Sequence, residues 1–139
     1  MGYAAYKLAS IEDTKMDHTH LLIKAAIGNP PKEEQELNSW LRSLVSDIDM
    51  KILIEPFSKY LDVEGNRGIT GVVVIETSHC SVHIWDEQSP ALLQLDVYSC
   101  ADFKTTAVIK RLKDFQLLFW ESMRIDRNDK LKVIERMAG

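Results

Sequence analysis

The sequence predicts an α+β fold, a two-layer sandwich in which an antiparallel sheet carries helices on one face. Three observations predict it: strand patterns outnumber helix patterns, the middle strands are joined by short connections, and two segments show apolar residues at helical spacing. Short connections favour antiparallel pairing, and amphipathic helices bury their apolar side against a sheet. With 139 residues, 45% hydrophobic and 27% charged, the chain is expected to form a single domain over residues 1–139.

The elements of the first half follow from apolar spacing and turn residues. Residues 1–16 show no clean periodicity and are expected to form a poorly ordered extension. Residues 19–26 form a short apolar run typical of a strand, and residues 51–60 form a second one with Pro56 at an edge or a bulge. Between them, Asn29 is expected to cap a helix, with proline in its first turn. The apolar stripe of that helix consists of Leu37, Trp40, Leu41, Leu44, Val45 and Ile48.

The second half continues with strands. After a loop at 62–68, residues 69–76 are β-branched and continuously apolar, which predicts a central strand that is buried on both faces or closely covered. Asp102 is expected to cap a second helix, whose apolar side includes Val108 and Leu112. Further strands are expected at 79–85, 92–98 and 116–123, and the last 15 residues carry no strong pattern. The predicted order is therefore β-α-β-β-β-β-α-β.

Composition excludes several classes of function. The net charge is −4 and the pI about 5.5, which argues against nucleic acid as a partner because phosphate binding requires a basic surface. The apolar runs are far shorter than a membrane span, and no export signal is readable. The two cysteines are therefore expected as free thiols, and the protein is expected in the cytoplasm.

Candidate chemistry gathers around Ser78, which follows the apolar run and lies beside His79, Cys80 and His83. A serine next to a base can be a nucleophile, but the glycine-flanked serine of the hydrolase elbow is absent. A zinc site from the four histidines and two cysteines has no diagnostic spacing, so no metal is expected.

Two segments carry a more specific pattern, GITGVVVIETSHCSVHIWDE at 68–87 and LDVYSC at 95–100. They contain Thr70, where the family has serine, followed by Ser78, His83 and Cys100. These residue types occur in the same order, and at nearly the same spacing, in the small prokaryotic S-adenosylmethionine decarboxylases. Together with His20-Leu21-Leu22 near the start, the chain resembles that family over residues 18–123. The resemblance implies an enzyme that makes its own cofactor, a covalent pyruvoyl group, from an internal serine.

Carried over position by position, the resemblance implies that Ser78 is the pyruvoyl precursor and that the chain cleaves itself between Thr77 and Ser78, giving fragments 1–77 and 78–139. Ser78 Oγ would attack the carbonyl carbon of Thr77, and the hydroxyl of Thr70 would bond the developing oxyanion. His83 would remove the Cα proton so that the ester eliminates. Cys100 would later donate a proton to the substrate α-carbon.

The resemblance also implies a substrate and a partner. S-adenosylmethionine would form a Schiff base with the pyruvoyl ketone and lose CO₂, which makes the chain a carboxy-lyase that supplies the aminopropyl donor for spermidine synthesis. Phe57 and Tyr60 would stack on adenine or meet the sulfonium, and Glu87 would hold the ribose hydroxyls. The protein would be a homodimer of processed protomers, with the site at or near the subunit interface.

Departures from the family pattern leave alternatives open. Thr77 stands at the scissile bond where the family has glutamate, and Thr70 replaces a serine. On a regular strand Ser78 and His83 point to opposite faces, so a bulge is expected near 78–81. The alternatives are a decarboxylase of the same scaffold acting on another amino acid, such as arginine or ornithine, and an unprocessed, non-catalytic relative.

Overall fold

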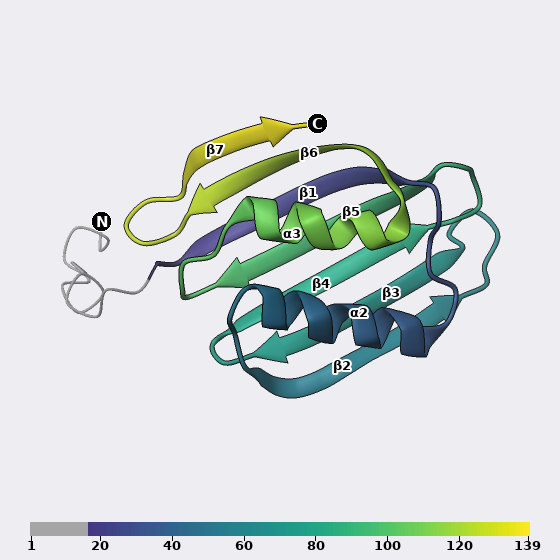
Figure 1. Cartoon of the computed structure of the whole chain (residues 1–139), viewed down its shortest axis with the longest axis horizontal. Helices are drawn as coiled ribbons and strands as arrows, with labels where there is room; N and C mark the ends of the chain where they lie inside the picture. The colour runs from purple at the N-terminus through teal and green to yellow at the C-terminus, as the bar shows by residue number, and fades with distance from the viewer. Residues whose placement is uncertain (1–16) are drawn as a thin grey trace, which may run out of the picture.

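A computed structural model describes residues 17–139, so the extension expected at 1–16 lies outside the described residues. The chain forms seven described strands, two α-helices and a 3₁₀ turn (Figure 1). In chain order these are β1 (Thr19–Ile27), α2 (Glu34–Asp47), β2 (Ile52–Leu61), β3 (Gly68–Ile75), β4 (Ser78–Trp85), β5 (Ala91–Ser99), α3 (Thr105–Leu112), η2 (Lys113–Phe115), β6 (Leu117–Asp126) and β7 (Lys132–Ala138).

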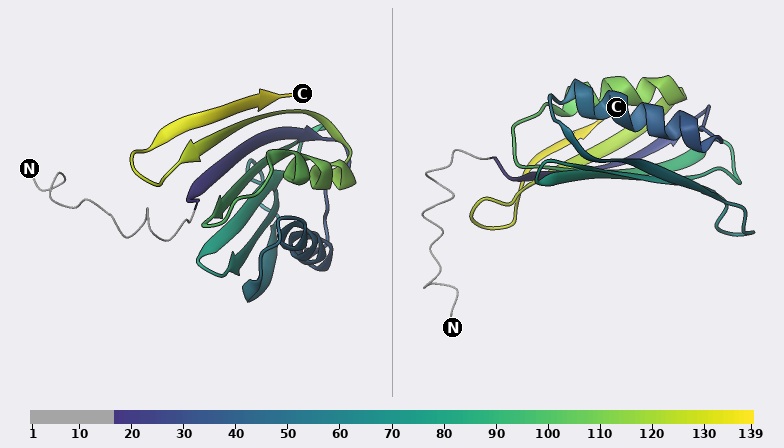
Figure 2. Two further views of the ribbon diagram at one scale, coloured as in Figure 1. Left: turned by 60° about the vertical axis from the view of Figure 1, so that its left-hand side comes forward. Right: turned by 90° about the horizontal axis from the view of Figure 1, so that it is seen from below.

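All seven strands belong to one antiparallel sheet in the order β2-β3-β4-β5-β1-β6-β7. The strand β1 lies between β5 and β6, so the first strand of the described residues is inside the sheet. Both helices pack on the same face, and the opposite face is uncovered by any described element (Figure 2). The predicted α+β sandwich and the predicted element order are confirmed. The strand β7, which falls in the unassigned last 15 residues, is added at the edge.

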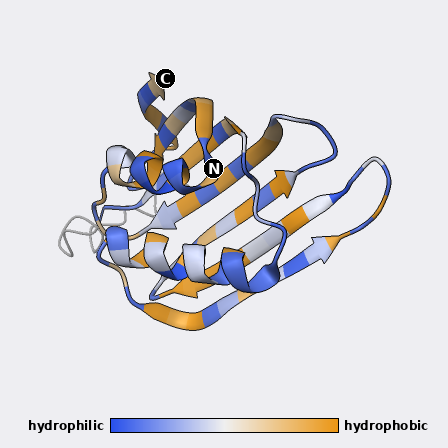
Figure 3. Ribbon diagram, turned by 45° about the vertical axis from the view of Figure 1, so that its right-hand side comes forward, coloured by the Kyte–Doolittle hydropathy of each residue, from blue (hydrophilic) through white to orange (hydrophobic). Residues whose placement is uncertain are grey.

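The hydrophobic core lies between the helices and the sheet. Leu37, Leu41 and Leu44 of α2 are fully buried, and Trp40 donates its indole N–H to the carbonyl of Arg111, 3.1 Å away. The strands supply alternate residues, as the banded colouring of Figure 3 illustrates. In β5, for example, Leu93, Leu95 and Val97 are buried. This confirms the predicted apolar stripe of the first helix.

Both predicted helix caps are wrong. The helix α2 begins at Glu34 after the extended Glu33, so Asn29 and the prolines belong to the preceding loop. The helix α3 begins at Thr105 after Lys104, three residues beyond Asp102, and neither N-cap side chain bonds the helix. Tertiary packing positions these helix starts, because capping contributes only about 1 kcal/mol.

The strand β3 is covered on one face, contrary to the prediction. Ile69, Val73 and Ile75 are buried under α2, whereas Thr70 and Val72 point to the uncovered face and are exposed. Pro56 lies on β2, where the pairing with β3 shifts register between Ile54 and Phe57, so its prediction at an edge or bulge is confirmed. Within the part of the chain that the structure describes, no helix is long and apolar enough to cross a membrane.

Candidate active site

The turn between β3 and β4 carries the predicted cleavage point. Ile75 pairs with Ser78, so Glu76 and Thr77 alone form the turn. Thr77 has φ 53°, in the left-handed region that a β-branched residue rarely adopts. The peptide between Thr77 and Ser78 therefore follows directly on a strained residue.

The side chains around this peptide are held by the segment that leaves β5. Ser78 is 5% exposed, and its Oγ accepts the backbone N–H of Cys100 at 3.0 Å. The hydroxyl of Thr77 donates to the carbonyl of Glu76 at 2.8 Å, and its Oγ1 lies 2.7 Å from the sulfur of Cys100. Three of the residues assigned from the resemblance, Thr77, Ser78 and Cys100, thus meet in one chain.

The other two predicted catalytic residues form a separate pair. Thr70 Oγ1 and His83 Nδ1 are hydrogen-bonded at 3.0 Å, across the register pair that joins β3 to β4. They line a small hollow of about 200 Å³ on the uncovered face, together with Trp85 and Asn66. Five residues separate His83 from Ser78, which is about 16 Å along a strand.

The bulge predicted near 78–81 is wrong. The pairing of β4 with β3 runs without a register shift from Ile75↔Ser78 to Gly68↔Trp85, and its pairing with β5 is equally regular. Ser78 therefore faces the helices, while His83 faces the uncovered side of the sheet. Within one chain the strand does not bend to bring His83 to Ser78.

The predicted substrate-binding residues also divide. Phe57 lies on the uncovered face and is 64% exposed. Tyr60, an odd number of residues further along β2, packs against the core, and its hydroxyl donates to the Asp86 carboxylate at 3.0 Å. Partial burial and then this carboxylate raise the pKa of Tyr60. The two rings do not share a face within one chain, and whether Phe57 and Tyr60 stack on adenine or meet the sulfonium stays a prediction.

Glu87 holds the loop between β2 and β3. Its carboxylate accepts the backbone N–H of Arg67 at 2.8 Å and of Gly65 at 3.1 Å, and these bonds lower the pKa of Glu87. Because it follows β4, Glu87 lies at the same end of the sheet as Thr70 and His83, away from Ser78. Whether it also binds ribose stays a prediction.

A histidine cluster on the uncovered face was not assigned to the site from the sequence. His18 Nδ1 lies 2.8 Å from the hydroxyl of Tyr98, and His20 pairs with Asp96 at 3.3 Å. The His79 ring lies 5.5 Å from that of Tyr98. The available signal was the spacing of His18, directly before β1, and His20 on that strand, because residues two positions apart on an extended chain share a face. Among the described residues no group of three or more metal-ligating side chains is arranged to hold an ion.

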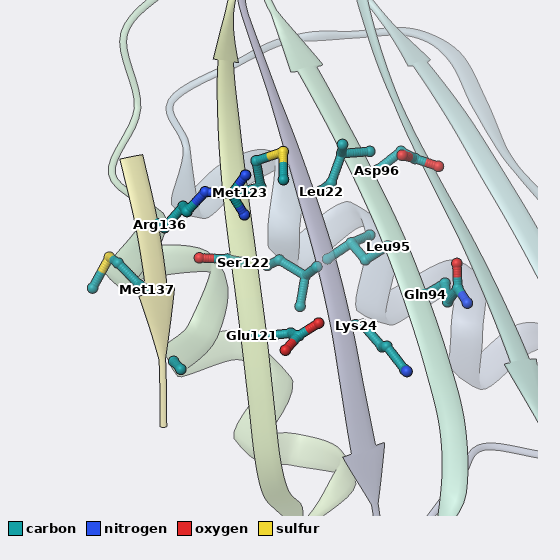
Figure 4. Close-up of a pocket in the computed structure, with 12 residues that line it drawn as sticks. Leu22, Lys24, Gln94, Leu95, Asp96, Glu121, Ser122, Met123, Arg136 and Met137 are labelled. Carbon is teal, nitrogen blue, oxygen red and sulfur yellow. The ribbon is translucent and has the colours of Figure 1, made fainter. Parts of the chain in front are cut away.

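The uncovered face forms a shallow hollow of about 580 Å³ over β5, β1, β6 and β7 (Figure 4). Aliphatic and charged side chains alternate across it, including Leu22, Lys24, Asp96, Glu121, Met123 and Arg136. Beyond this hollow, large apolar side chains on the same face are open to solvent, with Val72 39% and Phe119 61% exposed. Soluble monomers seldom expose apolar surface over a whole sheet face, so the surface has the character of an interface.

Comparison with known proteins identifies the family of this site. The family model described as S-adenosylmethionine decarboxylase matches residues 19–127. Two relatives named S-adenosylmethionine decarboxylase proenzyme come from Archaeoglobus fulgidus, 33% identical over 75 residues and 54% of this chain, and from Pyrococcus horikoshii, 31% identical over 83 residues and 60% of this chain. The matched parts span 63% and 57% of the length of these curated relatives.

The fold has a solved counterpart. The crystal structure of the adenosylmethionine decarboxylase from Aquifex aeolicus superposes with a TM-score of 0.61, covering 87% of this chain and 95% of that one at 21% sequence identity. This likeness supports the fold, and the family model supports the membership, since its match includes both the Thr77–Ser78 turn and the Thr70–His83 pair. The chain belongs to the S-adenosylmethionine decarboxylase family.

Proposed function

We propose that the protein decarboxylates S-adenosylmethionine with a pyruvoyl group that it generates by breaking its own chain between Thr77 and Ser78. The observation that carries the proposal is the turn itself, where the strained Thr77 precedes a buried Ser78 whose Oγ is held by the N–H of Cys100. The product would serve as the aminopropyl donor for spermidine synthesis. Family membership supports the substrate.

The residues of the turn fit the formation of such a group. Ser78 Oγ attacks the carbonyl carbon of Thr77, the bond from that carbon to the Ser78 nitrogen breaks, and the hydroxyl proton passes to the nitrogen. A base then removes the Ser78 Cα proton, and the Cβ–Oγ bond breaks to release the Thr77 carboxylate. Water completes the change of the remaining dehydroalanine to a ketone and ammonia. A pyruvoyl group supplies the electron sink for loss of CO₂.

The separation of the two pairs favours a site shared by two protomers. Thr70 and His83 are about 16 Å from the Ser78 turn within one chain, and they lie on the face whose apolar residues are uncovered. If two copies stack these faces with opposed directions, the Thr70–His83 pair of one protomer lies over the Ser78 end of the other. His83 would then act as the base on Ser78 of the second copy, and Cys100 would donate the final proton within its own chain.

Self-cleavage is tested by intact-protein mass spectrometry under denaturing conditions, with Ser78→Ala as the control. We expect two fragments that divide between Thr77 and Ser78, the second with the mass of a pyruvoyl terminus. A single 15.9 kDa chain that persists on incubation would overturn the proposal and favour the non-catalytic relative. For the substrate, release of labelled CO₂ is compared among S-adenosylmethionine, arginine and ornithine, and a preference for either amino acid would overturn the assigned substrate.

The shared site is tested by complementation. Ser78→Ala retains His83, and His83→Ala retains Ser78, so each homodimer lacks one part of every site. In a co-expressed mixture, a heterodimer has one complete site, and the His83→Ala chain should be cleaved there. If the His83→Ala chain is cleaved no faster in the mixture than by itself, His83 does not act from the second protomer.

A further inference from the structure

We propose that Thr77 is a positioning residue whose hydroxyl holds the Cys100 thiol in place in the uncut chain and releases it when the Thr77–Ser78 bond breaks. This inference rests on the proposed function and adds a device to it. The chain would keep its proton donor restrained until the cofactor has been made.

The hydrogen bonds of Thr77 and Cys100 carry the argument. The oxygen of the Thr77 hydroxyl lies 2.8 Å from the carbonyl oxygen of Glu76, to which it can donate its one proton. The same oxygen lies 2.7 Å from the sulfur of Cys100, and either group can be the donor of that bond. The thiol can also donate to the Glu76 carbonyl, 3.8 Å from the sulfur. These contacts hold the sulfur in one position against the turn.

The backbone explains why cleavage ends this contact. Thr77 reaches Cys100 because its left-handed φ directs the turn toward the segment that leaves β5. That conformation is maintained by the hairpin, which is closed by the pairing of Ile75 with Ser78. Once the peptide to Ser78 is broken, Thr77 is a chain end carrying a carboxylate, and the hairpin no longer fixes its φ. The sulfur then loses its contact with the Thr77 hydroxyl, next to the group that Ser78 has become.

The test measures the alkylation rate of Cys100 in the uncut chain, so it depends on neither cleavage nor decarboxylase activity. In a Ser78→Ala background, Thr77→Val keeps the β-branched shape and removes the hydroxyl, whereas Thr77→Ser keeps the hydroxyl. Cys80 is an internal control, because it is fully buried and burial raises its pKa to about 12. Peptide mass spectrometry after treatment with iodoacetamide reports the two cysteines separately.

We expect Thr77→Val to raise the alkylation rate of Cys100 by about tenfold, the value of one lost hydrogen bond, and Thr77→Ser to leave it within about twofold. Rescue of the slow rate by Thr77→Ser distinguishes loss of the hydroxyl contact from a merely structural change at the turn. Equal rates for threonine and valine would overturn the inference. If Cys80 of the valine variant also reacts, the comparison moves to Thr77→Ala, where a rate equal to that of the threonine parent would again overturn it.

The outcome is separable from that of the proposed function. A chain that never cleaves but shows the contrast between valine and serine would refute the proposed function and leave the restraint of Cys100 in place. A chain that cleaves and decarboxylates, yet shows no contrast, would refute the restraint alone.

Discussion

Replacing Thr77 by glycine should slow self-cleavage while relieving strain in the uncut chain. Thr77 has φ 53°, and a non-glycine residue held in this region costs about 1–3 kcal/mol, a cost that glycine does not incur. Attack by Ser78 Oγ reroutes the chain through Cβ and Oγ and lengthens the turn by one bond, so the ester no longer requires the strained φ. The wild-type chain therefore releases strain on the way to the ester, and the glycine variant has none to release.

The size of the effect follows from the barrier. Loss of about 1–3 kcal/mol of released strain corresponds to cleavage that is roughly fivefold to 150-fold slower. The assay is the decay of intact chain by mass spectrometry after refolding from denaturant. Thr77→Val removes the hydroxyl but keeps the strain, so it should cleave at least as fast as wild type. Gln116→Gly relieves a left-handed residue, φ 56°, at the opposite end of the sheet from the turn and should leave the rate unchanged. A glycine variant that cleaves at the wild-type rate would refute the strain argument.

Two further predictions concern the scaffold. Gly71→Ala should destabilise the fold by about 1–3 kcal/mol in urea unfolding, because a Cβ there would lie 2.8 Å from both Leu37 Cδ2 and Ser58 Oγ; an unchanged midpoint would mean that α2 moves aside without cost. Burial lowers the pKa of His20 from its ordinary 6.5, and Asp96 opposes this effect. The stabilisation that neutral His20 contributes is therefore complete above pH 6.5, and it is lost as the pH falls through the lowered pKa. His20→Asn should therefore lose less stability than wild type between about pH 7.5 and about pH 5.5 in parallel urea titrations, and equal losses would contradict this assignment.

The fold was largely predictable because its signals are local. Alternation in 92–98 and the apolar stripe of α2 each specify an element together with the face that it buries. The strand β7 lacked such a signal, because it is a charged edge strand that pairs on one side with β6 and buries little. The caps at Asn29 and Asp102 failed because these residues lie four and two positions before the observed N-caps, and packing of the helix overrules a local capping preference.

The sequence predicted a set of candidate site residues but not how they are arranged in space. The resemblance supplied Thr70, Ser78, His83 and Cys100, and it carries no information on which chain provides each of them. The bulge near 78–81 was inferred from the requirement that Ser78 and His83 meet in one chain, and the regular pairing of β4 removes the basis of that inference. In the sequence Thr77 is only a departure from the family's glutamate, whereas its backbone conformation and its contact with Cys100 become visible only in three dimensions.

The uncovered apolar face connects these two failures. A continuous apolar run such as β3 normally indicates a strand covered on both faces, and here the second cover is missing within the described chain, where Val72 is exposed. Likewise, Ser78 contacts Cys100 and Thr70 contacts His83, but the two pairs are too far apart within one chain to act together. A second copy on that face would satisfy both requirements at once, because it would bury β3 and bring a histidine to each Ser78. Assembly and self-cleavage should therefore be coupled, with the unpaired protomer stable as an uncut chain.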